Sequence, residues 1–371
     1  MVVDTLSSYK RIVVKVGSSL LVDGEQHQLK TSFLQMLAAE LAALRDRHHD
    51  IILVSSGAIA LGRDQIALSS RWQLRHAQAA AAVGQIALAG AWTDALKKQG
   101  LVAAQILLTM DDTENRRRYL NARDTLGTLL ESHIIPIINE NDTVATEEIR
   151  FGDNDRLAAR VAAMMEADLL VLLSDVDGLY DRPPHHQNAQ HIPLVESITK
   201  DVQCMAGASQ SGLGSGGMMT KIDAGVIATS SGCAMIIASG LMPQPLSYLQ
   251  QGGQHTLFLP QTDALSARHA WILGSLRQHG WIKMDQGASD AIIQGRSLLA
   301  VGVTEVNGDF ERGDSIRLLG PEGQLLAVGL AGYDADDMRR IMGKQSQDIE
   351  TILGPGERGA LVHRDHLVCK V

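Results

Sequence analysis

The sequence predicts an α/β protein, with a mostly parallel sheet sandwiched by helices and a small β-barrel-like domain behind it. Short apolar runs alternate with helical patterns in the first part of the chain, which is the order that builds a parallel sheet. The chain has 371 residues, more than most single hydrophobic cores contain, and its pattern changes near residue 278. We therefore expect two domains, at residues 1–265 and 277–371.

The first domain opens with a β-branched run at residues 11–16, which predicts the first strand. Apolar residues at helical spacing follow from Phe33 to Leu44, and a long Ala-rich helix is expected over residues 72–98. Further strands are expected at residues 51–54, 102–107, 134–138 and 169–173. The strands end in clusters of Gly, Ser, Asn or Asp. Turns alone could require such residues, but together the clusters favour one site, because open α/β sheets bind ligands at the carboxyl ends of their strands.

The tail reads as an antiparallel, barrel-like module, because short strand-like stretches alternate there with Gly-containing turns. The strands are expected at residues 298–303, 315–319, 325–330 and 360–363. We place the domain boundary near Leu276.

Charge and cysteine content exclude several classes of protein. The formal net charge of −9 argues against a nucleic-acid backbone as the main partner, and acidic residues outnumber basic ones in the tail as well. The three cysteines match neither a disulfide framework nor a zinc spacing. The N-terminus lacks the features of a signal peptide, and the most apolar helix, at residues 77–92, is too short to span a bilayer. We expect a cytoplasmic protein with no membrane contact.

The first motif that carries chemistry is V-V-K-V-G-S-S, at residues 13–19. A buried strand delivers Lys15 beside a glycine turn whose backbone N–H groups favour an anion. The chain contains no Walker A sequence. A lysine that merely snorkels from a strand end is the alternative.

The second motif is S-G-L-G-S-G-G-M-M-T-K, at residues 211–221. It formally contains G-x-G-x-x-G, but no clear strand precedes it, so a dinucleotide site does not fit. We interpret it as a glycine-rich loop entering a helix, where N–H groups and Lys221 engage triphosphate oxygens. A plain flexible loop is the alternative.

The third motif is F-G-D-N-D-R, at residues 151–156, downstream of I-N-E-N-D-T. Asp142, Asp153 and Asp155 bring negative charge to a region that needs lysines and a metal ion to balance it. Asn139, Asn141 and Asn154 add amide donors suited to a substrate carboxylate. The alternative is a solvated acidic loop.

Taken together, the motifs resemble the amino acid kinase superfamily, and within it the glutamate 5-kinases (γ-glutamyl kinases). The resemblance covers roughly residues 10 to 260 and rests on these segments in family order: V-V-K-V-G-S-S, L-V-S-S-G-A-I-A-L-G, A-A-A-A-V-G-Q, I-I-P-I-I-N-E-N-D-T-V, F-G-D-N-D-R-L, L-L-S-D-V-D-G-L-Y and G-S-G-G-M-M-T-K. The tail resembles the PUA domain appended to bacterial members. Ser174 departs from the usual Thr, and the loop at residues 182–191 is unusually rich in His and Pro.

The resemblance implies an enzyme that transfers the γ-phosphoryl group of ATP, with Mg²⁺, to the side-chain carboxylate of L-glutamate. This reaction opens proline synthesis. The implied catalytic residues are Lys15, Lys221 and Asp155. The implied ATP-binding residues are Lys15, Ser174, Asp175, Ser215, Gly216, Gly217, Met218, Met219, Thr220 and Lys221. The implied glutamate-binding residues are Ser55, Asp142 and Asn154, with Asp142 suited to the α-ammonium group and Asn154 able to donate to a carboxylate. No metal ion bound by the protein alone is expected.

The resemblance also implies inhibition by proline at the glutamate pocket, a homodimer or homotetramer, and hand-over of the acyl phosphate to glutamyl phosphate reductase. Association through the Ala-rich helix competes with simple packing of that helix on its own sheet. Two other functions stay open: an acetylglutamate, aspartate or uridylate kinase of the same superfamily, and RNA binding through the tail. His185, His186 and His191 could suggest a metal site, but they lie in a Pro-rich loop, and we expect solvated histidines instead.

Overall fold

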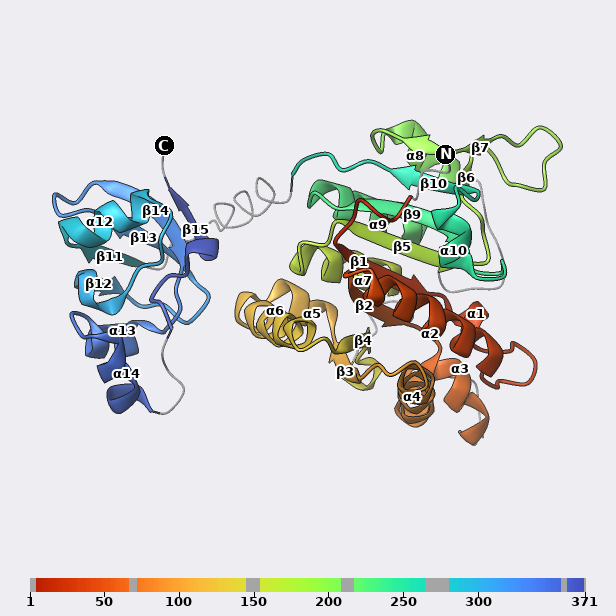
Figure 1. Cartoon of the computed structure of the whole chain (residues 1–371), viewed down its shortest axis with the longest axis horizontal. Helices are drawn as coiled ribbons and strands as arrows, with labels where there is room; N and C mark the ends of the chain where they lie inside the picture. The colour runs from red at the N-terminus through yellow and green to blue at the C-terminus, as the bar shows by residue number, and fades with distance from the viewer. Residues whose placement is uncertain are drawn as a thin grey trace. The chain divides into compact units, whose positions relative to one another are not determined.

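The computed structural model describes residues 5–66, 72–144, 154–207, 217–263, 280–354 and 359–369. The chain divides into two compact units, one of residues 1–115 with 121–264 and one of residues 116–120 with 265–371. The expected boundary near Leu276 lies outside the described residues. Each unit is considered by itself, and Figure 1 labels their elements.

The described part of the first unit is built on an eight-stranded sheet of order β3-β4-β2-β1-β5-β9-β10-β8. In that order, the strands are Ala103–Leu108, Ile135–Glu140, Asp50–Ser55, Arg11–Val16, Leu169–Ser174, Ala234–Ser239, His255–Phe258 and Leu194–Val195. Neighbouring strands from β3 to β9 are parallel, and β10 is antiparallel to β9. The central strands are buried along almost their whole length, which explains their continuous apolar runs. The predicted parallel sheet is confirmed.

Helices cover the sheet on both faces (Figure 1). The α-helices of the first unit are α1 Ser18–Leu21, α2 Thr31–Asp46, α3 Ala58–Gly62, α4 Leu74–Lys97, α5 Met110–Glu114, α7 Asn154–Met164, α8 Lys200–Gly207, α9 Met218–Ser230 and α10 Pro245–Gln250. Helix α6 Arg116–Glu131 begins in residues of the second unit and continues in the first from Asn121. Short 3₁₀ turns η1 Arg63–Gln65 and η2 Asp142–Val144 and the hairpin β6 Leu179–Tyr180 with β7 His191–Ile192 complete it. None of the described helices is both long and apolar enough to cross a membrane.

The alternation of side chains along β1 decides which residue reaches which face. Val14 and Val16 belong to the hydrophobic core that α2, α4 and α10 share with the sheet. Lys15 points to the opposite face, where it meets Asp155 of α7 and where α9 packs beside α7. Because alternate residues of β1 face opposite sides of the sheet, Val14 and Val16 enter the hydrophobic core while Lys15 reaches the charged cluster.

Helix α4 packs closely against α3 at two glycines. A Cβ atom added to Gly84 would lie 1.9 Å from the carbonyl oxygen of Ala58, and one added to Gly62 would lie 1.9 Å from that of Ala80. The same helix buries Trp92 completely, yet leaves Ile86 78% exposed. One face of the Ala-rich helix thus packs on its own unit, and an apolar strip remains on the other face.

The second unit contains a five-stranded sheet of order β12-β11-β13-β14-β15 among its described residues. These strands are Val303–Gly308, Gly280–Met284, Ser315–Leu319, Leu325–Leu330 and Leu367–Cys369, in sheet order. The unit also has helices α12 Gln286–Ile293, α13 Ala335–Ile341 and α14 Ser346–Leu353 and the 3₁₀ turns η3 Ala300–Gly302 and η4 Arg364–His366. Strands β11 and β13 pair in parallel, whereas the other pairs are antiparallel, so the expected purely antiparallel module is corrected in this respect.

Two expected strands of the tail are wrong. Residues 298–303 contain η3, and only Val303 begins a strand; Leu298 makes an isolated bridge to Val362, the sole pairing within the expected strand at 360–363. Leu298, Ala300 and Val362 are all buried in the core of this unit. Their apolar pattern therefore recorded burial rather than strand structure.

Candidate active site

The polar clusters that follow β1, β2 and β4 lie next to one another. The backbone N–H of Gly17 donates to the carbonyl of Leu173 at 3.1 Å, and that of Ser56 donates to Val16 at 3.2 Å. Asn154, at the start of α7, donates to Ser56 and to Asn139. The carboxyl ends of neighbouring parallel strands thus bring together residues from distant parts of the sequence, as expected for an open α/β sheet.

A buried charged cluster lies on the α7 and α9 face. Nζ of Lys15 is 2.5 Å from Oδ1 of Asp155, and Nζ of Lys221 is 3.1 Å from Oδ2 of the same carboxylate. The hydroxyl of Thr220 also donates to Oδ2, at 3.0 Å. The three charged side chains are almost fully buried. Lys15, Lys221 and Asp155, for which the family resemblance implies catalytic roles, are therefore one contiguous group.

Burial alone would raise the pKa of the Asp155 carboxyl. The charges of Lys15 and Lys221 and their hydrogen bonds hold that pKa well below its usual range instead. Among the described residues, Asp155 is the only carboxylate that pairs with either lysine. Two buried cations thus share one anion, and the excess positive charge favours an anionic ligand at this place.

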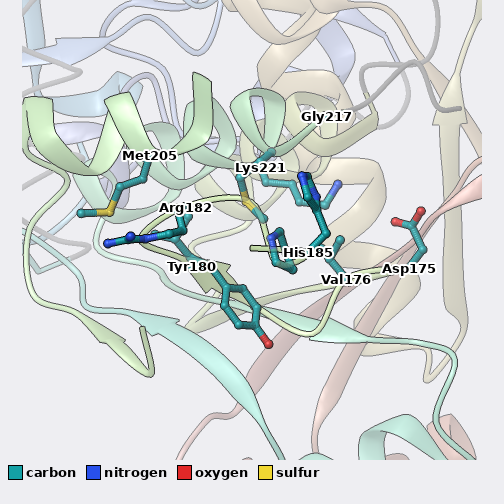
Figure 2. A pocket seen from close by; sticks show the side chains of 12 residues that line it. Asp175, Val176, Tyr180, Arg182, His185, Met205, Gly217 and Lys221 are labelled. Atoms are coloured by element: carbon teal, nitrogen blue, oxygen red, sulfur yellow. The ribbon is translucent and has the colours of Figure 1, made fainter. Parts of the chain in front are cut away.

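A pocket of about 290 Å³ opens beside Lys221. Figure 2 shows side chains from three elements facing it: Tyr180, with Arg182 and His185 of the β6–β7 loop; Met205 of α8; and Lys221 of α9. Apolar and aromatic side chains around a few charged groups are typical of a site for a small organic ligand. The pocket and the charged cluster share Lys221, so one ligand can occupy the pocket and reach the cluster.

The predicted ATP-binding residues divide around this pocket. Asp175, Gly217, Met218 and Lys221 line it. Ser174 is buried, and its hydroxyl accepts from the N–H of Val176 at 3.3 Å. Thr220 contacts Asp155, whereas Met219 is 43% exposed. Ser215 and Gly216 lie outside the described residues, and so does Asp153.

Several pocket residues were missed from the sequence. Tyr180 is held by hydrogen bonds from its hydroxyl to both carboxylate oxygens of Asp177, at 3.2 Å each, and its ring meets that of His191 edge-on. His185 is exposed, as expected of a solvated histidine, and it also lines the pocket. No group of His, Cys, Asp and Glu among the described residues could hold a metal ion. The His- and Pro-rich composition of the loop was the signal that could have placed it here.

A network of neutral polar groups lies at the carboxyl ends of β2 and β4 and at the start of α7. Nδ2 of Asn154 donates to Oγ of Ser56 at 2.8 Å and to Oδ1 of Asn139 at 3.1 Å. Nδ2 of Asn139 donates in turn to Oε1 of Gln85, on α4, at 2.7 Å. Asn139, Asn154 and Ser56 are all buried. Gln85 and Ser56 did not appear among the residues predicted from the sequence.

The side chain of Ser55, predicted to bind glutamate, faces the α4 side. Its Oγ accepts the indole N–H of Trp92 at 2.8 Å, and both residues have no exposed surface. The side chain of Ser55 is therefore part of the core packing, and the hydroxyl that joins the polar network belongs to the next residue, Ser56.

Asp142 begins η2, two residues after the end of β4. Its carboxyl is buried, and burial raises its pKa to about 6. At neutral pH the group is mainly ionised but poorly hydrated. Such a carboxylate gains more than an exposed one from a cationic partner.

The order of these motifs, the fold and the buried cluster can be compared with known proteins. A family model described as the amino acid kinase family matches residues 10–239. The chain belongs to the amino acid kinase family. A second model, the PUA domain, matches residues 280–353, so this member of the family carries a PUA domain behind its kinase region.

Curated relatives of this amino acid kinase family member are similar over nearly their full length. A glutamate 5-kinase of Rhizobium etli (strain CIAT 652) is 54% identical over 365 residues, which cover 98% of this chain and 94% of the relative. Glutamate 5-kinase 1 of Rhizobium meliloti (strain 1021) is also 54% identical over 365 residues, covering 98% of this chain and 93% of the relative.

Among solved structures, the carbamate kinase from Giardia lamblia bound to AMP-PNP is similar in fold. The TM-score is 0.50 at 16% sequence identity, over 69% of this chain and all of that one. At this identity the likeness supports the amino acid kinase fold alone.

Proposed function

We propose that this chain is a glutamate 5-kinase, which phosphorylates the side-chain carboxylate of L-glutamate with ATP. The observation that carries the proposal is the buried cluster in which Lys15 and Lys221 share Asp155 beside a ligand-sized pocket. The relatives at 54% identity, which are named glutamate 5-kinases, support the choice of substrate.

The chemistry of the acceptor agrees with this cluster. A glutamate side chain has a reference pKa of about 4.3 and is ionised at neutral pH, so the nucleophile needs no general base. Phosphoryl transfer then depends on positioning and on neutralising charge over the phosphoryl oxygens. Lys15 and Lys221 supply two cations for that purpose, and Asp155 fixes both ammonium groups from one side.

We propose that the phosphate donor is MgATP. The donor set suits magnesium that is carried by the nucleotide, because the Asp155 carboxylate is already paired with two lysines. Magnesium commonly reaches such sites on nucleotide phosphates, with few protein ligands. Asp175, in the wall of the pocket, is the carboxylate best placed to meet it. The proposed nucleotide site comprises Ser174, Asp175 and residues 215–221.

The experiment is a hydroxylamine trap for the acyl phosphate, combined with a measurement of ADP release. Hydroxamate should form with L-glutamate and MgATP. N-acetylglutamate and aspartate should give little hydroxamate, and UMP should not increase ADP release. Turnover of any of these three at a rate that matches glutamate would refute the proposal.

Four further proposals accompany this function. Proline should inhibit at the glutamate pocket, because it shares the α-ammonium and α-carboxylate groups of glutamate. An inhibition curve that glutamate cannot shift would contradict this.

We propose that the chain associates through the exposed apolar strip of α4 around Ile86. Light scattering that shows a monomer would contradict this association. We also propose a cytoplasmic location, which fractionation tests. Hand-over of the product to glutamyl phosphate reductase fits a labile acyl phosphate and would appear as faster coupled flux than free diffusion allows.

A further inference from the structure

The β6–β7 hairpin forms a large part of the wall of the pocket beside Lys221. Half of the residues that line this pocket belong to the segment 178–185, which runs through β6 into the loop before β7. The hairpin has two residues in each strand and forms a sheet of its own, apart from the eight-stranded sheet. A lone two-stranded hairpin is marginally stable. Its position therefore depends on the contacts that tie it to the rest of the unit.

One buried hydroxyl joins both strands of the hairpin to the main sheet. Thr256, on β10, has no exposed surface. The backbone N–H of Leu179 on β6 donates to Oγ1 of Thr256 at 2.7 Å. The same Oγ1 donates to the carbonyl oxygen of Ile192 on β7 at 2.6 Å. A backbone N–H can only donate, so the single hydroxyl hydrogen goes to Ile192, and the hydroxyl links one strand of the hairpin to the other.

The chain leaves room for this contact at Gly178. A Cβ atom added to Gly178 would lie 2.7 Å from Oγ1 of Thr256 and 2.5 Å from Nε2 of His191. Gly178 also has a φ of +151°, a backbone conformation that residues with a side chain rarely adopt. Glycine at this position therefore allows β6 to approach the hydroxyl directly.

A second tether holds the tip of Tyr180. The hydroxyl of Tyr180 donates to the carboxylate of Asp177, 3.2 Å from either oxygen. Nε2 of Gln254, two residues before Thr256, donates to the Tyr180 hydroxyl at 3.0 Å and to Oδ2 of Asp177 at 2.8 Å. Both tethers thus come from the start of β10, and neither Gln254 nor Thr256 is among the residues that line the pocket.

We propose that Thr256 is a positioning residue for the nucleotide, because its buried hydroxyl clamps the β6–β7 hairpin where the hairpin forms one wall of the pocket. Gln254 supports this clamp through Tyr180. The inference rests on the proposed function and deepens it, since it gives β10 a part in holding MgATP.

The two ends of a nucleotide should depend on the clamp to different extents. Leu179, Tyr180 and Pro184 make the hairpin side of the pocket apolar and aromatic, which suits a nucleobase. The lysines that suit the phosphates stand on β1 and α9 and are held by Asp155, without the hairpin. A loosened clamp should therefore weaken binding of the nucleoside end and spare the phosphate end.

Thr256→Val tests the clamp, because valine keeps nearly the same volume and lacks the hydroxyl. The dissociation constant of MgATP, from calorimetric titration of the full-length chain without glutamate, should rise about tenfold, as when a buried polar group loses its partner. The inhibition constant of adenosine should rise by a similar factor, whereas that of magnesium tripolyphosphate should change little. KM for ATP should rise with kcat and KM for glutamate within about twofold, the pattern of lost uniform binding.

Two further variants separate positioning from general loss of structure. Thr256→Ser keeps the hydroxyl and should restore the affinity for MgATP. Thr229→Val is the matched control, because Thr229 is also buried but its hydroxyl donates to Gly225 within α9. An unaltered MgATP constant in Thr256→Val, equal losses for adenosine and tripolyphosphate, or the same loss in Thr229→Val would overturn the proposal.

Gln254 provides the test if Thr256→Val does not fold, because its side chain is exposed. Gln254→Leu removes the donor to Tyr180 and Asp177 and should raise the MgATP constant by about threefold, the effect of losing one exposed hydrogen bond. Gln251→Leu makes the same change three residues earlier, also at an exposed position. A loss confined to Gln254→Leu supports the clamp, whereas no loss, or an equal loss in both variants, contradicts it.

Failure of the proposed function gives a different result from failure of this inference. If MgATP binds and Thr256→Val weakens that binding, but the unaltered chain does not phosphorylate glutamate, the function is wrong and the clamp stands. If the chain phosphorylates glutamate and its affinity for MgATP does not depend on the Thr256 hydroxyl, only the clamp is wrong.

Discussion

The site has two parts of different chemical character, a charged cluster and a network of neutral amides. On the α7 and α9 face, Lys15, Asp155 and Lys221 form a buried cluster with one more positive than negative charge. At the end of β4, Asn139 and Asn154 form a buried network of neutral amides. Electrostatic interactions between charges extend over distance and become stronger in a buried site, whereas the energy of an amide hydrogen bond depends on its direction.

This difference teaches which step each part should control. A group that neutralises charge helps most where charge develops, so the lysine cluster should govern the rate of phosphoryl transfer. A network with fixed hydrogen-bond directions distinguishes one ligand from another before any reaction occurs, so the amide network should govern affinity for the amino acid. Variants in the two parts should therefore divide cleanly between kcat and KM.

The largest effect is expected in the charged cluster. Lys15→Ala or Lys221→Ala should lower kcat by about 10²–10³, the usual loss when one electrostatic donor to a transition state is removed. KM for glutamate should change by only a few-fold, because neither lysine belongs to the amide network. Steady-state kinetics of both variants measure this division. A normal kcat with a raised KM would show that the lysine cluster acts on glutamate binding and not on phosphoryl transfer.

On the substrate side, Asp142→Asn should raise KM for glutamate by about tenfold to a hundredfold with little change in kcat. The asparagine keeps the shape of the side chain but removes the charge that we propose pairs with the ammonium group, and hydrogen bonds to charged groups are the stronger ones. Kinetics at several glutamate concentrations provide the test. A fall in kcat without a change in KM would assign Asp142 to the chemical step instead.

The pH dependence sharpens the same assignment. Burial raises the pKa of Asp142 to about 6, so the carboxyl becomes neutral as the pH falls through that value. Below it, KM for glutamate should rise by up to about tenfold per pH unit, since only the ionised form pairs with the ammonium group. The Asp142→Asn variant should lose this dependence. An equal rise of KM in the variant would place the titrating group elsewhere.

The smallest effect concerns the free energy of unfolding and the packing on α3 of helix α4, which carries Gln85. Gly84→Ala places a methyl group against the backbone of Ala58 and should lower the free energy of unfolding by about 1–3 kcal/mol. Gly90 has no atom within 4 Å of an added Cβ, so Gly90→Ala should raise it by about 0.5–1 kcal/mol through helix propensity.

Denaturant unfolding of the two glycine variants gives the comparison, with KM for glutamate as a second readout. Gly84→Ala should also raise KM, since Gln85 moves with the helix. Equal stability of the two variants would contradict the close packing of α4 on α3.

Much of the fold and several residues of the candidate site could be predicted from the sequence. Continuous β-branched runs identified β1 and β5 because strands buried on both faces need apolar residues throughout. Lys221 stood out because the helix dipole disfavours a cation at a helix start. Lys15 gained its role only from the resemblance to the family, since a lysine can also snorkel from a strand end. The tail was harder, because Leu298 and Ala300 are buried without forming a strand, and burial alone leaves the local structure open.

The sequence by itself determined the parallel sheet, the chemical character of the strand ends and the residues that carry charge. Only the tertiary structure decided how those residues are used. The hydroxyl of Ser55 is taken up by Trp92, and the amide of Asn154 has its polarity set by Asn139 and, through it, by the backbone of Glu140. The physical reason is that the sequence states which side chains are present, whereas the direction of a hydrogen bond depends on which partners the strand register and the packing of α4 bring within hydrogen-bond distance.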